Sequence, residues 1–146
     1  MRLLRCLQIF HFGAPSLNER DNICESVVRF VAAKGPTKQC FIGFENIVQG
    51  RTVLHDPTQE LLKRLGDLRP RVLPLSRLKG MRVEHEMVVD YDDCHDKAVW
   101  WLWGIDRFSD GQAAVLALQG STLYRFELVR KQGRWTTVRD EPMTYF

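Results

Sequence analysis

Apolar residues recur at helical spacing early in the chain. Ser16 and Glu19 precede most of them with the spacing of a capping box, and the pair Gly35–Pro36 follows them. The apolar positions form one stripe of a helix, which consists of Ile23, Val27, Phe30 and Val31. We therefore predict an amphipathic helix that begins at Ser16 and ends at Gly35–Pro36.

The next apolar stretch is short and aromatic. The segment QCFIGFENIV, at residues 39–48, predicts a strand in which Gly43 marks a bulge or a close approach of another backbone. A second helix is predicted after it, with Asp56 as its N-cap, Pro57 at its first position and Gly66 as its stop. Its apolar face would carry the leucines of ELLKRL.

The rest of the chain has the pattern of strands. Prolines in and before residues 72–78 favour an edge strand or an extended connection there. Residues 81–91 alternate between apolar and polar, as in a half-buried strand, whereas KAVWWLWGI at 97–105 is apolar on both faces, which is typical of a central strand. The motifs SDG and KQG then separate further strands as hairpin turns. A meander of four or five antiparallel strands is predicted.

Helices followed by consecutive strands predict an α+β fold. We expect two N-terminal helices packed on one face of a curved, mainly antiparallel sheet of four to six strands. A chain of 146 residues with 45% hydrophobic content suits one core, so residues 16–146 are predicted to form a single domain preceded by an N-terminal segment, 1–15. A curved sheet over helices makes a cup in which a ligand could bind.

Charge allows a nucleic-acid partner but does not favour one. The net charge is only +3, and the cations are scattered along the chain. Local density occurs in one segment, which contains Lys63, Arg64, Arg69, Arg71 and Arg77. A weak positive charge would suit an acidic protein partner.

Cysteine usage and hydropathy favour a cytoplasmic protein. The four cysteines include no CxxC pair, so we expect reduced thiols, and Cys24 with Cys40 is the pair to test for a bridge. The start, MRLLRCLQIFHFG, is a degenerate match to an export signal because polar residues interrupt its apolar run. No stretch reaches the roughly eighteen apolar residues of a membrane span, and no membrane association is predicted.

The acidic loop between two predicted strands could hold a metal ion or form a turn. Its oxygen and nitrogen donors are Asp90, Asp92, Asp93, His95 and Asp96. The spacing differs from that of an EF-hand, which needs glycine and glutamate where this loop places His95 and Trp101. Cys94 next to His95 makes a poor catalytic pair because adjacent side chains seldom face each other. The pattern favours a hairpin loop, and no metal, cofactor or catalytic residue is predicted.

Three surfaces of the predicted sheet could carry function. The first is a partner-binding face that would contain Trp100, Leu102, Arg125 and Glu127. The second is a ligand site in the cup, with His85, Tyr91 and Tyr124 as its polar residues and Glu127 as a further one in an enzyme. The third is a nucleic-acid surface on which Trp100 would stack beside Arg64, Arg69, Arg71 and Arg77. Trp101, Trp103 and Trp135 are expected in the core.

Three segments together resemble a family of small bacterial proteins of unknown function. They are DPTQELLKRL, RVLPLSRL and the terminal LYRFELVRKQGRWTTVRDEPMTYF, and the likeness covers roughly residues 17–146. In that pattern a proline-flanked segment precedes a sheet that ends in a Gly-Arg-Trp hairpin. The final hairpin is also similar to domains like nuclear transport factor 2, which have helices on a curved sheet. Such folds serve as enzymes, binding modules and immunity proteins, so the resemblance implies an architecture and no chemistry.

The sequence thus favours a non-enzymatic binding protein. We expect a bacterial accessory or immunity-type protein that contacts another, acidic, protein through its sheet face. A small enzyme or ligand-binding protein with its site in the cup is the alternative, and a nucleic-acid-binding module is a weaker one. A homodimer formed through the tryptophan-rich strand would cover the same surface without a foreign partner.

Overall fold

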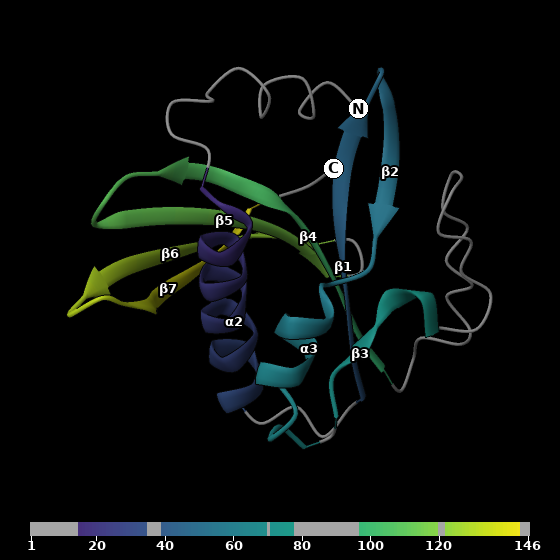
Figure 1. Cartoon of the computed structure of the whole chain (residues 1–146), viewed down its shortest axis with the longest axis horizontal. Helices are drawn as coiled ribbons and strands as arrows, with labels where there is room; N and C mark the ends of the chain where they lie inside the picture. Colours follow the sequence, from purple (N-terminus) through teal and green to yellow (C-terminus); the bar gives the residue numbers. More distant parts are fainter. Residues whose placement is uncertain (1–14, 35–38, 70, 78–96, 120–121, 144–146) are drawn as a thin grey trace.

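Two helices pack against one curved, twisted sheet in the computed structural model (Figure 1). The structure describes residues 15–34, 39–69, 71–77, 97–119 and 122–143. Its elements are α2 (Leu17–Ala33), β1 (Gln39–Val48), β2 (Arg51–His55), α3 (Gln59–Arg64), β3 (Leu73–Pro74), the 3-10 helix η1 (Leu75–Arg77), β4 (Lys97–Phe108), β5 (Gln112–Gln119), β6 (Thr122–Lys131) and β7 (Arg134–Met143). The predicted α+β class is confirmed.

The strands form one sheet in the order β2-β1-β4-β5-β6-β7, and β3 pairs with β1 outside this path. Strands β4 to β7 are the predicted antiparallel meander, while β1 runs parallel to β4 and to β3. Strand β4 lies between β1 and β5, so the central position predicted from its apolar sequence is confirmed. Among the described residues the sheet has seven strands, above the predicted four to six, because the two-residue β3 joins it. The strand predicted at 81–91 lies outside the described residues.

Helix α2 forms where the apolar stripe predicted it. The Ser16 hydroxyl accepts a hydrogen bond from the Glu19 amide at 3.2 Å, which satisfies a donor that has no partner within the helix. The buried side of the helix consists of Asp21, Ile23, Cys24, Val27 and Val28. Phe30 and Val31 are half-buried at the margin of the core.

Helix α3 has a different N-cap from the predicted one. Thr58, not Asp56, caps it, and the Thr58 hydroxyl accepts a hydrogen bond from the Leu61 amide at 3.1 Å. Asp56 instead binds the start of the next turn, because its carboxylate accepts hydrogen bonds from the backbone amide and the hydroxyl of Ser76. Asp and Thr are both good caps, so this local sequence offered two of them only two residues apart.

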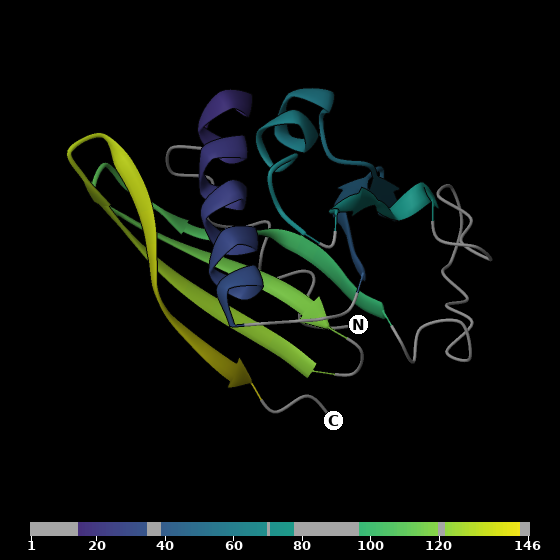
Figure 2. The same cartoon turned by 90° about the horizontal axis from the view of Figure 1, so that it is seen from below.

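Both helices cover the same side of the sheet and share one core (Figure 2). The core unites α2 with Leu61 of α3, with Leu65 at the C-cap of α3, and with residues of five strands. Those strand residues are Cys40, Ile42, Phe44, Ile105, Phe108, Ala113, Val115, Ala117, Tyr124, Phe126, Leu128 and Trp135. Successive side chains of a strand alternate between faces. The intervening β6 residues therefore belong to the face that points away from the helices.

Gly43 is a site of close approach, which the sequence predicted as one of two possibilities. A Cβ atom at Gly43 would lie 2.7 Å from Cδ2 and 2.9 Å from Cβ of Leu75 in η1. Leu75 is itself buried. Only glycine lets the turn that follows β3 lie this close to β1.

The two described cysteines are free thiols. Cys24 is buried in α2 and Cys40 is half-buried in β1, and they form no disulfide with each other. Burial raises the pKa of each thiol to about 12. Neither thiol therefore has the thiolate character that reactive cysteines need.

Candidate functional site

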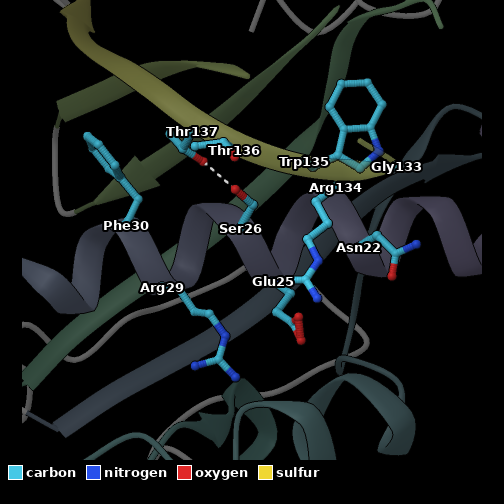
Figure 3. A pocket seen from close by; sticks show the side chains of 10 residues that line it. All are labelled: Asn22, Glu25, Ser26, Arg29, Phe30, Gly133, Arg134, Trp135, Thr136 and Thr137. Carbon is cyan, nitrogen blue, oxygen red and sulfur yellow. Dashed lines mark hydrogen bonds between the residues drawn. The ribbon is translucent and has the colours of Figure 1, made fainter. Parts of the chain in front are cut away.

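A groove of about 600 Å³ runs between α2 and β7 (Figure 3). Five consecutive residues of the β6–β7 hairpin, Gly133 to Thr137, form one wall. The other wall is a stripe of α2 that consists of Asn22, Glu25, Ser26, Arg29 and Phe30. Side chains of neighbouring strand residues point to opposite faces, so five consecutive lining residues mean that the edge of the strand, with its backbone, borders the groove.

Three sets of contacts fix the walls relative to each other. At the start of α2, the Glu19 carboxylate accepts a hydrogen bond from Trp135 Nε1 at 2.6 Å and pairs with Arg130 at 3.2 Å. In the middle, the Ser26 and Thr137 hydroxyls lie 2.9 Å apart and share a hydrogen bond. At the end, Lys34 Nζ lies 2.7 Å from the Asp140 carboxylate and 4.6 Å from the centre of the Phe30 ring. The groove is therefore preformed along its length.

Two charged residues of the groove, Arg134 and Glu25, form no ion pair among the described residues. Glu25 nevertheless lies near Arg29, because the pKa of Arg29 is raised by its hydrogen bond to Asp67 and also by the charge of Glu25. The Arg134 side chain extends from β7 toward Glu25 on α2, as Figure 3 shows. Neither residue has an ion-pair partner among the described residues, and the two do not pair with each other. Arg134 is exposed and Glu25 half-buried. A bound molecule could therefore contact both a guanidinium and a carboxylate.

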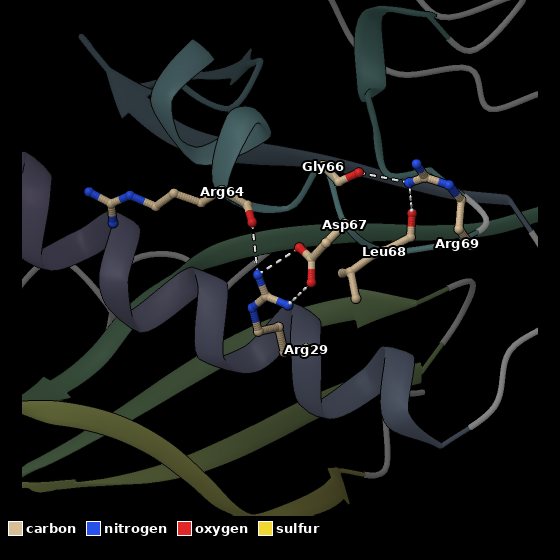
Figure 4. A network of polar contacts seen from close by, with 6 residues as sticks. All are labelled: Arg29, Arg64, Gly66, Asp67, Leu68 and Arg69. Carbon is tan, nitrogen blue, oxygen red and sulfur yellow. Dashed lines mark hydrogen bonds and ion pairs between the residues drawn. The ribbon is translucent and has the colours of Figure 1, made fainter.

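Arg29, in contrast, is used by the fold itself (Figure 4). Its guanidinium donates two hydrogen bonds of 2.9 Å to the Asp67 carboxylate and one of 2.8 Å to the Arg64 carbonyl. The hydrogen bond from Arg29 lowers the pKa of Asp67 below its usual value. This fork ties α2 to the segment that follows α3, so Arg29 shapes the groove while its charge is already balanced.

A second, smaller pocket of about 200 Å³ lies beside the start of α2. Asp21 and Phe44 are buried in its wall, while His55 and Asp56 are exposed at its rim. The Asp21 carboxylate accepts a hydrogen bond of 2.7 Å from the Thr58 hydroxyl, which holds the cap of α3 against α2. This contact is structural, so the buried carboxylate does not by itself make a site.

The predicted partner-binding residues lie on two strands, β4 and β6. Arg125 and Glu127 lie on the side that points away from the helices, where Arg125 pairs with Asp106 and Glu127 lies 2.8 Å from Arg139. Trp100 is aligned in the backbone register with Ile42, and Leu102 with Phe44; Ile42 and Phe44 belong to the core beneath the helices.

The predicted ligand cup is described only in part. Tyr124 is half-buried and packs against the core, with its ring 6.3 Å from that of Phe126. Glu127 is three positions further along β6, on the opposite face, so these two do not converge on one site. His85 and Tyr91 lie outside the described residues.

The basic segment does not form a free stripe in the part that the structure describes. Arg64 donates hydrogen bonds to Asn18 and Asn22 on α2, and Arg69 donates to the Gly66 and Leu68 carbonyls (Figure 4). Arg71 and Arg77 are exposed. Guanidinium groups that bind their own backbone are poorly placed to bind phosphates as well.

The acidic loop at 90–96, with Cys94 and His95, lies outside the described residues. Within the ranges that are described, no three His, Cys, Asp or Glu side chains are grouped closely enough to hold a metal ion. None of the helices in those ranges is both long and apolar enough to cross a membrane.

Comparisons with known proteins give no relative from which a role could be transferred. No protein-family model matches the chain, and no curated protein or solved structure matches it. The groove must therefore be interpreted from its own geometry.

Sequence reasoning did not identify this groove. The α2 side was visible as the polar flank of the apolar stripe, and Trp135 was expected in the core, where it lies. The sequence pattern does not show which strand lies at the edge of the sheet or which helix lies beside that strand. Both depend on the order of the strands in the folded sheet. The Gly-Arg-Trp motif at 133–135 was the available signal, because it sits at the mouth of the groove.

Proposed function

We propose that the protein is a non-enzymatic binding module that contacts another protein at the groove between α2 and β7. The observation that carries this proposal is a preformed, open groove with a strand edge as one wall and two charged residues of opposite sign, Arg134 and Glu25, that form no ion pair among the described residues. Sites of this kind suit a polypeptide ligand, since a strand edge offers backbone hydrogen bonds and charged walls give selectivity. An accessory or immunity-type role is one form that such binding would take.

The groove supports binding better than the predicted sheet face does. On that face, Arg125 and Glu127 are each engaged in an ion pair within the molecule. A partner would have to break or bridge these pairs, at a cost in desolvation. Arg134, by comparison, is exposed and has no such pair to lose among the described residues.

The test is affinity capture from the native host, followed by calorimetry with the purified partner. We expect a stoichiometric protein partner whose affinity falls at least about tenfold, or ~1.4 kcal/mol, in Arg134→Glu. Arg107→Glu is the matched control, because Arg107 on β4 is also exposed and is not among the residues that line the groove. Circular dichroism should show that both variants fold.

Two results would count against the proposal. Capture of no stoichiometric partner would contradict binding as the function. A partner that binds Arg134→Glu as tightly as the wild type, and loses affinity for Arg125→Ala, would place the interface on the sheet face instead.

A further inference from the structure

The turn between β6 and β7 determines which backbone groups of β7 point toward β6 and which point to the outer edge of the sheet. Gln132 and Gly133 have φ angles of 53° and 76°, as in the two-residue turns that close antiparallel hairpins. In such a hairpin, the residues that flank the turn exchange hydrogen bonds, which makes Lys131 and Arg134 a bonded pair. The next pair, Arg130 and Trp135, is then non-bonded, and the backbone groups of Trp135 point away from β6.

An independent contact supports this assignment of bonded and non-bonded pairs. The Arg130 amide donates a 3.0 Å hydrogen bond to the Gly111 carbonyl on the far side of β6, so it is not directed at Trp135. Bonded and non-bonded pairs alternate along an antiparallel ladder. The amide and carbonyl groups of Trp135 and Thr137 therefore point to the outer edge of β7, and those of Thr136 point to β6.

This outer edge is open in the part of the chain that the structure describes. Strand β7 ends the strand order, and no described strand pairs with its far side. Trp135 and Thr137 are among the residues that line the groove, so their outward backbone groups border it. Unpaired backbone amides and carbonyls at a strand edge are a template for an added strand, so this edge suits an extended ligand.

The same strand argues against a second copy of the chain as the occupant. Between the Leu128–Thr137 and Glu127–Arg139 pairs, Val138 has no partner on β6 and forms a bulge. Pro142, further along, has no amide to donate. Bulges and prolines on an edge strand prevent long edge-to-edge pairing between copies. The bulge divides β7 into two short regular runs, Arg134–Thr137 and Arg139–Met143, and the second contains the proline.

We propose that the partner enters the groove as a short extended segment that adds a strand to β7 and carries an acidic side chain opposite Arg134. This inference rests on the proposed function and specifies how the partner binds. The added strand would exchange backbone hydrogen bonds with Trp135 and Thr137. Its carboxylate would form a cross-strand ion pair with the exposed Arg134 guanidinium, and the adjacent Lys131, also exposed, adds a second cation.

The experiment uses the full chain and a displayed library of random linear decapeptides as the probe. We expect selection to enrich peptides that contain Asp or Glu among β-branched residues. Their binding should fall about tenfold or more in Arg134→Glu and stay unchanged in the control Arg107→Glu. Replacing the acidic residue of a selected peptide by lysine should restore binding to Arg134→Glu, which separates a lost ion pair from a misfolded variant.

Amide hydrogen exchange locates the peptide. In the free protein the Trp135 and Thr137 amides should exchange faster than the Thr136 amide, and a selected peptide should slow their exchange about tenfold or more. A peptide that leaves both rates unchanged overturns the strand-addition proposal. So does a library that yields no acidic peptide. If the captured host protein nevertheless binds, the proposed function stands and only the extended mode falls.

Light scattering tests the remaining possibility, that a second copy of the chain occupies the groove. A dimer that dissociates in Arg134→Glu would identify a second copy of the chain as the occupant, and the foreign segment would be excluded. A monomer at the concentrations used for the peptide titration is the expected result.

Discussion

The Thr58 hydroxyl is a single group on which two elements depend. It accepts the Leu61 amide as the cap of α3 and donates to the buried Asp21 carboxylate on α2. Asp21 is only 4% exposed, so it has little water to replace a lost donor. One side chain thus begins one helix and satisfies a charge on another.

Replacing Thr58 by valine should therefore destabilise the fold although the shape is kept. We expect the free energy of unfolding to fall by about 1–3 kcal/mol, from the lost cap and the unsatisfied carboxylate. Thr58→Ser, which keeps the hydroxyl, is the matched control and should lose less. Urea denaturation followed by circular dichroism measures both, and equal stability of the wild type and Thr58→Val would show that water replaces the hydroxyl.

At the scale of elements, the contact between β1 and η1 is set by Gly43. An added methyl group would lie within 3 Å of Leu75, and overpacking of this kind usually costs about 1–3 kcal/mol. We expect Gly43→Ala to lower the unfolding free energy by that amount. Gly111→Ala is the control, since nothing lies within 4 Å of its Cβ position. Equal losses in the two variants would contradict a steric cause.

The same contact shows what the sequence could predict about elements. The capping box, the apolar stripe of α2 and the antiparallel meander were all readable because they depend on neighbours in the chain. Strand β2 was missed, although Gln49–Gly50 repeats the Gln-Gly pair at 132–133 and has the same positive φ angles. Gly43 was recognised as special, but the group that approaches it could not be named, because Leu75 reaches it through the tertiary fold.

At the scale of the whole molecule, the buried thiols should make the folded state less stable at alkaline pH. Burial raises the pKa of Cys24 and Cys40 to about 12, whereas their ordinary value is 9.0. As the pH rises, these thiols therefore lose their protons in the unfolded chain before they lose them in the folded chain. The contribution of the buried thiols to stability is intact below pH 9 and declines between pH 9 and pH 12. The slope is at most about 1.4 kcal/mol per pH unit for each thiol.

Cys24→Ala should reduce this dependence while lowering stability at neutral pH through lost packing. Urea midpoints are measured from pH 7 to pH 10.5 for the wild type and the variant, and the change of the midpoint with pH is compared between them. Lysines and tyrosines titrate in both proteins, so their effect cancels in this comparison. Parallel curves would show that the Cys24 thiol does not control the alkaline transition. At pH 8 the native thiols should also react slowly with a disulfide reagent, and urea should speed the reaction.

The groove is the feature of the whole molecule that sequence reasoning could not reach. The acidic loop drew attention because its ligand-type residues are adjacent in the chain, whereas the groove joins residues of α2 to residues more than a hundred positions away on β7. Pattern reasoning assigned Trp135 and Phe30 to the core correctly. It could not show that β7 ends the sheet, or that Arg134 would remain without a partner among the described residues.

The strand order also divides the sheet into two parts of different origin. Strands β1, β2 and β3 come from one continuous stretch of chain, and β4 to β7 come from another. In the described sheet, the parallel pairing of β1 with β4 is the one seam between them. Hairpins close over short loops, but this seam must bring together segments far apart in the sequence. The rate of folding should therefore be governed by docking of the two parts at the seam, with the groove strand β7 already formed.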